Sequence, residues 1–374
     1  MPKQFINPTK LPSESTLTKT DLDTPFLAVD LEKFDSNVAR LSQGTKDFDV
    51  HWRPHCKGHK SSIIASRLVA AGAIGATCAK LGEAEIMVRG GVPDVLIANL
   101  IVGENKLSRL AKLCKEGKPI VCIDHMDQAV PMNEVMLRED VQCRVIIEVN
   151  IGLDRVGCAP DKTLELARQL HAMPGLNFAG IMGYEGHLLT IEDQNEKRSE
   201  IENALKLLAE NAKQLQEEGI PCEIVSCGGT GSYLLSRMQE GITELQAGGG
   251  MFMDQFYERQ CQVTGMKKAL TIIATVVGRP TADRAIIDSG KKTLHVEYEP
   301  AIVVGRDDIQ VTRLSAEHGE LELTGDAQNL KIGDRVELVP GYADMTCVLH
   351  DFFYVFQNDT LVDIWPLEAR GLLQ

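Results

Sequence analysis

The chain has 374 residues and a formal net charge of −14, so it is long enough for a large domain plus a smaller one, while its acidity argues against a nucleic-acid surface, which needs a basic stripe. No apolar run approaches the ~18 residues of a membrane span, and the polar segment Met1–Lys19 leads into no apolar stretch, so we expect neither a signal peptide nor membrane attachment. The ten cysteines form no C-x-x-C pair, which favours reduced thiols in a cytoplasmic protein over structural zinc.

Short apolar runs alternate with amphipathic stretches from Thr24 to about Gly250. Phe26–Asp30 has the pattern of a lead-in strand, and the helical pattern after it places Leu31, Phe34, Val38 and Leu41 on one face. Eight further strands are expected near Val50–Arg53, Ile74–Cys78, Asp94–Asn99, Ile120–Asp124, Arg144–Asn150, Asn177–Tyr184, Glu223–Cys227 and Thr243–Ala247. Helical segments between them include Leu107–Lys115, Thr163–His171 and Ile201–Glu217. This alternation predicts an α/β fold with a parallel sheet, closed as a (β/α)₈ barrel of TIM type.

The pattern changes after Cys261, where strands are separated by Gly, Asp or Asn turns and no long helix is indicated. The expected strands are Leu270–Val277, Arg284–Asp288, Gln310–Leu314, Glu320–Leu323, Arg335–Val339 and Phe352–Phe356. We therefore expect a barrel over residues 25–260 and a β-rich domain over residues 261–374, joined by residues 1–24.

A lysine lies where the first barrel strand should end, in the run Arg53-Pro54-His55-Cys56-Lys57-Gly58-His59-Lys60. Active sites of such barrels lie at the C-terminal ends of the strands. Partial desolvation there lowers the pKa of a lysine and makes it a nucleophile for a carbonyl group. The alternative interpretation of this run is two surface lysines at the start of a helix.

Two glycine-rich turns follow the seventh and eighth expected strands. The first contains Gly228, Gly229, Thr230, Gly231 and Ser232, and the second is Gly248-Gly249-Gly250. Glycines let the backbone approach a phosphate, and a following helix offers free N–H groups. Barrels often build phosphate sites from these two loops, although two tight turns would also account for the glycines. A nucleophilic lysine and a phosphate site in one barrel suggest an aldehyde cofactor that carries a phosphate.

The chain resembles the fold-type III pyridoxal 5′-phosphate (PLP) enzymes, whose barrel is of the alanine racemase N-terminal type. Within them it resembles the D-threonine aldolase family, which includes D-serine dehydratases and 3-hydroxyaspartate aldolases and dehydratases. The resemblance runs almost end to end. It is carried by Thr24–Leu27, Arg53–Lys57, Gly228–Ser232, Glu244–Gly248, Phe252–Asp254, Trp365-Pro366 and Ala369–Gly371.

The resemblance implies roles for particular residues. Lys57 would carry PLP as a Schiff base, and the glycine loops, including Gly248 and Gly249, would hold its phosphate. Arg155 would face the pyridine nitrogen and leave it as an unprotonated acceptor. Tyr184 would lie near the phosphate. By resemblance we also expect a homodimer acting on a small amino-acid substrate.

The chain departs from the family pattern where the divalent metal (Mn, Mg or Zn) should bind. The family has His-x-Asp or His-x-Cys there, whereas this chain has Tyr342-Ala343-Asp344. A phenol and one carboxylate make a poor site for such an ion, so a metal at Asp344 is doubtful. The base of the aldolases, a histidine that follows the tyrosine in a Gln-His pair, is also missing, because Leu189-Thr190 occupies those positions. His187, Tyr342 or His59 remain as candidate bases.

The cofactor residues are all present, but the reaction stays open. The leading interpretation is a lyase that cleaves a β-hydroxy-α-amino acid to an amino acid and an aldehyde, without the usual metal. The alternatives are an amino-acid racemase using Lys57 and Tyr342 on opposite faces, a dehydratase acting by β-elimination, and a PLP carrier without turnover.

Overall fold

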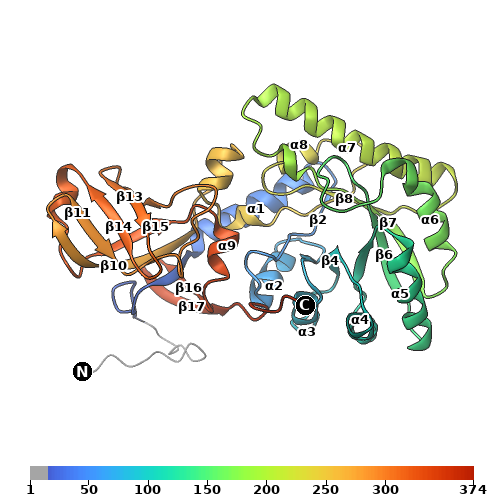
Figure 1. Ribbon diagram of the computed structural model, residues 1–374, viewed down its shortest axis with the longest axis horizontal. Coiled ribbons are helices and arrows are strands. Elements are labelled where there is room, and N and C mark those ends of the chain that lie inside the picture. The colour runs from blue at the N-terminus through green and yellow to red at the C-terminus, as the bar shows by residue number, and fades with distance from the viewer. Residues whose placement is uncertain (1–15) are drawn as a thin grey trace. The chain divides into compact units, whose positions relative to one another are not determined.

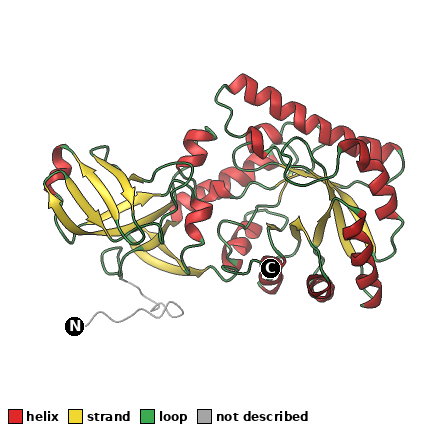
Figure 2. Cartoon of the chain, viewed as in Figure 1, coloured by secondary structure: helices red, strands yellow, loops and turns green. Residues whose placement is uncertain are grey.

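The computed structural model describes residues 16–374 and divides the chain into two compact units (Figures 1 and 2). We call the first the barrel unit; it contains Ala39–Gly248, Gln260–Gln262 and Ala369–Gln374. We call the second the β unit; its described part contains residues 16–38, Gly249–Arg259 and Val263–Glu368. None of the described helices combines the length and apolar character that crossing a membrane requires.

The barrel unit is built on a parallel eight-stranded sheet in the order β2-β9-β8-β7-β6-β5-β4-β3. Its strands are β2 (His51–Trp52), β3 (Ala76–Cys78), β4 (Val95–Leu100), β5 (Ile120–Ile123), β6 (Cys143–Glu148), β7 (Leu176–Met182), β8 (Ile224–Cys227) and β9 (Glu244–Leu245). The first and last strands of this order meet, because Ile74 N donates to Trp52 O (2.8 Å) and Cys56 N donates to Thr77 O (2.7 Å). These bonds close the sheet beside Lys57 and confirm the expected TIM-like barrel.

One helix precedes the first barrel strand in the sequence and the others lie between barrel strands; helices are red in Figure 2. They are α1 (Leu31–Lys46), α2 (Ser62–Ala70), α3 (Leu81–Arg89), α4 (Glu104–Glu116), α5 (Met126–Arg138), η1 (Pro160–Lys162), α6 (Thr163–His171), η2 (Gly186–Leu188), α7 (Gln194–Glu217) and α8 (Tyr233–Ser236).

The longest helix, α7, shows how sequence sets these elements. Asp193 caps it by accepting from the backbone N–H groups of Asn195 and Glu196 (3.0 and 2.9 Å), which satisfies donors that would otherwise lack partners. Ile201, Leu205 and Leu208 recur at helical spacing and are buried, so one face of α7 packs on the barrel.

The β unit contains a nine-stranded, mainly antiparallel sheet in the order β11-β14-β13-β12-β15-β10-β1-β16-β17. Its strands are β1 (Phe26–Asp30), β10 (Leu270–Thr281), β11 (Arg284–Ile287), β12 (Ile302–Val303), β13 (Ile309–Leu314), β14 (Gly319–Leu323), β15 (Arg335–Val339), β16 (Phe352–Gln357) and β17 (Thr360–Pro366). Short helical turns are η3 (Gly249–Met251), η4 (Phe256–Gln260), η5 (Gly325–Asn329) and α9 (Ala343–Cys347).

The strand β1 belongs to this sheet, although its sequence position suggested a lead into the barrel. It runs antiparallel to β10 and parallel to β16. Phe26 and Ala28 point into an apolar cluster with Ile273 and Phe356, and burial of that face places β1 here. Of residues 1–24, which we expected to join the β-rich domain, residues 1–15 lie outside the described part of the chain.

Candidate active site

Lys57 lies in the turn just after β2, and the other candidate cofactor residues of the barrel unit also follow strands. Arg155 follows β6, Tyr184 follows β7, the Gly228–Ser232 loop follows β8, and Gly248 follows β9. Because all strands of the barrel are parallel, these segments gather at one end of it. The Lys57 side chain is exposed there.

His55 shares this turn and stays uncharged at neutral pH. Its Nδ1 accepts a hydrogen bond from the backbone N–H of Lys57 (3.2 Å). Burial lowers the pKa of His55 well below its usual value, and the positive charge of Lys57 lowers it further. A neutral ring with Nδ1 as acceptor leaves Nε2–H as a donor. His55 therefore orders the lysine turn without adding a charge to it.

Tyr184 links Lys57, Arg155 and the first glycine loop. Burial raises the pKa of Tyr184 to about 12, and the charge of Lys57 partly opposes this. The Arg155 guanidinium carbon lies 5.9 Å from the centre of the Tyr184 ring, a favourable cation–π distance. A β-carbon on Gly229 would lie 3.0 Å from the Tyr184 hydroxyl oxygen, so a larger residue at this position would require the Tyr184 side chain to shift.

The glycine loop is held from behind by a buried carboxylate, Glu185. Its Oε1 accepts from the hydroxyls of Ser232 (2.6 Å) and Ser236 (2.7 Å), and its Oε2 accepts from Gly228 N (3.3 Å). The Ser232 hydroxyl is thus committed to Glu185. The helix after the loop, α8, has only four residues, so the loop glycines rather than a long helix dipole must provide any anion site.

Removing this carboxylate should loosen the loop. We expect Glu185→Ala to lower the free energy of unfolding by about 2–4 kcal/mol, because two buried hydroxyls lose their acceptor. Chemical denaturation measures this change, with Glu165→Ala on the exposed face of α6 as control. A loss equal to that of the control would show that Glu185 does not hold the loop.

The second glycine run spans both units. A β-carbon on Gly248 would lie 2.3 Å from the His55 carbonyl oxygen, so Gly248 lets the chain after β9 pass directly against the lysine turn. Gly249 belongs to the β unit, where a β-carbon would lie 2.5 Å from the Tyr257 ring. Gly249 therefore makes room for Tyr257.

His187 is exposed on η2. A β-carbon on Gly152 would lie 2.8 Å from its Nε2, so the ring lies against the loop that carries Arg155. The ring is therefore at the strand-end face of the barrel.

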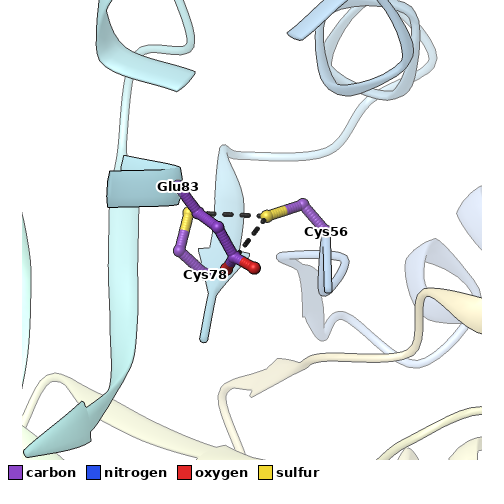
Figure 3. A group of neighbouring side chains, drawn as sticks. All are labelled: Cys56, Cys78 and Glu83. Atoms are coloured by element: carbon purple, nitrogen blue, oxygen red, sulfur yellow. Dashed lines mark hydrogen bonds between the residues drawn. The ribbon is translucent and has the colours of Figure 1, made fainter. Parts of the chain in front are cut away.

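Cys56, the residue before Lys57 in the sequence, forms a buried group with Cys78 and Glu83 (Figure 3). Cys56 Sγ is 3.5 Å from Cys78 Sγ and 3.9 Å from Glu83 Oε2. Among residues 16–374 these are the three possible ligand groups that lie within 4.8 Å of one another. The Lys60 ammonium forms an ion pair with Glu83, so a lysine side chain supplies the positive charge that balances the buried Glu83 carboxylate. The group anchors the chain on both sides of Lys57.

The expected metal position lies in the β unit, where Tyr342 occupies the place of the expected histidine. The Tyr342 hydroxyl donates to Asp344 Oδ2 (3.0 Å). The Tyr342 ring packs edge-on against Phe256 and Tyr298, with centroids 5.1 and 5.3 Å apart. A nearby carboxylate, Asp254, accepts from the backbone N–H groups of Tyr257 and Ala343 (2.9 and 2.8 Å). A neutral phenol in place of the histidine makes this pair of side chains a poor site for Mn²⁺ or Zn²⁺.

Asp254 should make the stability of the protein depend on pH. Burial raises its pKa from 3.8 to about 7, against the effect of its backbone hydrogen bonds. The folded state therefore binds a proton that the unfolded state has released, and the free energy of unfolding falls as pH rises from about 4 to about 7. The expected slope from this group is about 1.4 kcal/mol per pH unit. Denaturation at several pH values should show a flatter dependence for Asp254→Asn, and equal slopes would contradict the assignment.

Three buried or half-buried residues of this site, His55, Glu148 and Glu185, were not among the sequence candidates. Glu148 pairs with Arg155 (Nη2 to Oε1, 3.4 Å). His55 lies two residues before Lys57, Glu185 directly follows Tyr184, and Glu148 lies seven residues before Arg155. A polar residue at the end of an expected barrel strand is the signal that could have identified them.

Comparison with known proteins agrees with this geometry. Residues 29–255 match the model of the alanine racemase N-terminal domain, and residues 269–356 match a domain model named for serine dehydratase. The chain is 35% identical to the D-threonine aldolase of Arthrobacter sp. over 94% of this chain and 93% of that protein. It is 30% identical to the 3-hydroxy-D-aspartate aldolase of Paracoccus denitrificans (strain Pd 1222), over 96% of this chain and 95% of that protein.

A solved structure matches along the whole chain. The crystal structure of D-threonine aldolase from Filomicrobium marinum superposes with a TM-score of 0.94 at 34% identity, covering 98% of this chain and 100% of that one. The chain therefore belongs to the alanine racemase N-terminal domain family, among full-length relatives that include D-threonine aldolase.

Proposed function

We propose that the protein is a PLP-dependent lyase that cleaves a small β-hydroxy-α-amino acid into an amino acid and an aldehyde. One observation carries the proposal: a lysine, a guanidinium, a phenol and a glycine loop converge at the strand ends of a barrel. The full-length similarity to two aldolases supports it.

The residues of the barrel unit fit PLP. The glycine loop approaches Tyr184 so closely that a β-carbon on Gly229 would fill the space, which suits a phosphate held by backbone N–H groups. Lys57 provides an amine for the aldehyde, and Arg155 provides a permanent donor for the pyridine nitrogen. When bound, PLP supplies an electron-accepting ring that weakens the bonds of the amino acid's α-carbon.

The protein's own task is then to move protons. A base must take the proton of the β-hydroxyl while the bond between the α- and β-carbons breaks and the aldehyde leaves. We assign this step to Tyr342 or His187. Because the Tyr342 hydroxyl donates its proton to Asp344, its oxygen can take the β-hydroxyl proton only as its own proton passes to that carboxylate. Lys57 is the candidate for returning a proton to the α-carbon.

We further propose that this reaction proceeds without the divalent metal that the family resemblance implies. Its support is the donor set at Tyr342 and Asp344, where a phenol replaces the expected histidine.

The test is incubation of the purified protein with D- and L-β-hydroxy amino acids, with aldehyde release measured by a coupled dehydrogenase. Aldehyde formed from one enantiomer supports the lyase. Exchange of the α-proton in D₂O without aldehyde would replace it by the racemase, and formation of a keto acid with ammonia would replace it by the dehydratase.

We also propose a cytoplasmic homodimer. Ten free thiols among the described residues suit a reducing compartment, and the dimer follows from the fold-type III resemblance. The molar mass in solution, measured by light scattering after size-exclusion chromatography, tests the dimer, and the mass of a monomer would contradict it.

A further inference from the structure

We propose that Glu148 is a positioning residue that orients the guanidinium of Arg155 toward the cofactor. The inference rests on the proposed function, because it takes the pyridine nitrogen as the target of Arg155. It goes further by assigning a task to a buried carboxylate that the proposed reaction does not use.

Glu148 lies at the very end of β6 and is 4% exposed. Arg155 follows seven residues later, and its side chain is 55% exposed. Within the described chain, Glu148 is the carboxylate that pairs with Arg155. The Arg155 guanidinium also lies over the Tyr184 ring. One carboxylate and one aromatic ring thus set the direction of this side chain.

The loop between the two residues is built to hold them in register. Asn150 Oδ1 accepts from the backbone N–H groups of Gly152 (3.0 Å) and Asp154 (3.2 Å). Cys158 N donates to Glu148 O (2.9 Å) and returns the chain to the end of β6. With the backbone fixed in this way, the remaining freedom of Arg155 is in its long side chain, which an ion pair can restrict.

The second oxygen of Glu148 distinguishes it from an ordinary structural ion pair. Glu148 Oε2 is buried and has no hydrogen-bond partner among the described residues. Burial raises the pKa of Glu148, and Arg155 opposes this rise. Burying a carboxylate that is only half satisfied is costly, and such pairs rarely stabilise a fold. The task of orienting Arg155 explains why a carboxylate is kept at this buried position despite the free-energy cost of burying it.

The experiment measures PLP binding to apoprotein by absorbance titration, for Glu148→Gln, Arg155→Met and the double variant. If Glu148 acts through Arg155, each single variant weakens PLP binding about tenfold, the loss expected from one weakened charge-assisted hydrogen bond. The double variant should then bind no more weakly than Arg155→Met alone. Glu85→Gln is the matched control, since it breaks an ion pair with Arg109 on α3 and α4, and its PLP affinity should be unchanged.

The outcomes separate this inference from the proposed function. Additive losses, or Glu148→Gln binding PLP as tightly as the control, would overturn the role of Glu148. Unchanged binding in Arg155→Met would instead overturn the assignment of Arg155. If Glu148→Gln does not fold, Glu148→Asp replaces it: the charge remains but lies one methylene farther away, so a loss of affinity coupled to Arg155 is still expected. The absorbance maximum of the bound cofactor gives a second readout, because it should shift in both single variants and not in Glu85→Gln.

Discussion

Lys57→Ala is expected to abolish covalent PLP binding and to lower kcat/KM by at least about 10⁴-fold. The reason is that catalytic residues act together, so loss of the nucleophile alone removes most of the rate enhancement. Reduction with borohydride followed by peptide mass analysis measures the binding directly. The wild-type protein should carry one adduct, on the peptide that contains Lys57.

The neighbouring lysine provides an internal check on this result. Lys60 is 6% exposed and paired with Glu83, so its amine is engaged and buried, whereas Lys57 is exposed at the strand ends. An adduct on Lys60, or undiminished activity in Lys57→Ala, would refute the assignment. Lys112→Ala, on the exposed face of α4, should behave as wild type.

The barrel was predictable from sequence because its signals are local. Each of the eight expected strands overlaps an observed one, and the expected helix Thr163–His171 is α6 itself. Apolar runs of strand length, separated by amphipathic helices, leave few arrangements other than a parallel sheet. The expected strand ends placed Lys57 and the two glycine loops at one end of the barrel, whereas Arg155 and Tyr184 were implied only by the family resemblance.

Pairings between distant segments were not predictable in the same way. β1 precedes the barrel in sequence yet pairs with β10 and β16, more than 200 residues away. Glu185 meets Ser232 and Ser236 across 47 and 51 residues. A local pattern indicates whether each residue is buried but not which distant residue it contacts, so the bonds from Glu185 to Ser232 and Ser236 emerged only from the three-dimensional arrangement.

Removal of divalent metal is expected to leave the activity of this protein unchanged, and Tyr342→Phe is expected to lower kcat by about 10²–10⁴-fold, the usual contribution of a proton-transfer group. The reason is the donor set of the β unit. A phenol stands where the family has a histidine, and the Tyr342 hydroxyl donates to Asp344, so one ligand of the expected pair is lost. The measurement is the rate of aldehyde release after EDTA dialysis, with and without added Mn²⁺.

Tyr342→His is the complementary experiment, because it restores the His-x-Asp pattern that the family resemblance implies. An imidazole beside the Asp344 carboxylate is a far better ligand pair for Mn²⁺ or Zn²⁺ than a phenol, so this variant should bind metal in an equilibrium titration while the wild type does not. Val362→Ala, on the exposed part of β17, is the control and should match the wild type. Loss of wild-type activity on EDTA treatment, restored by Mn²⁺, would show instead that Tyr342 and Asp344 still support a cation. In that case the base must be sought elsewhere, with His187 as the first candidate.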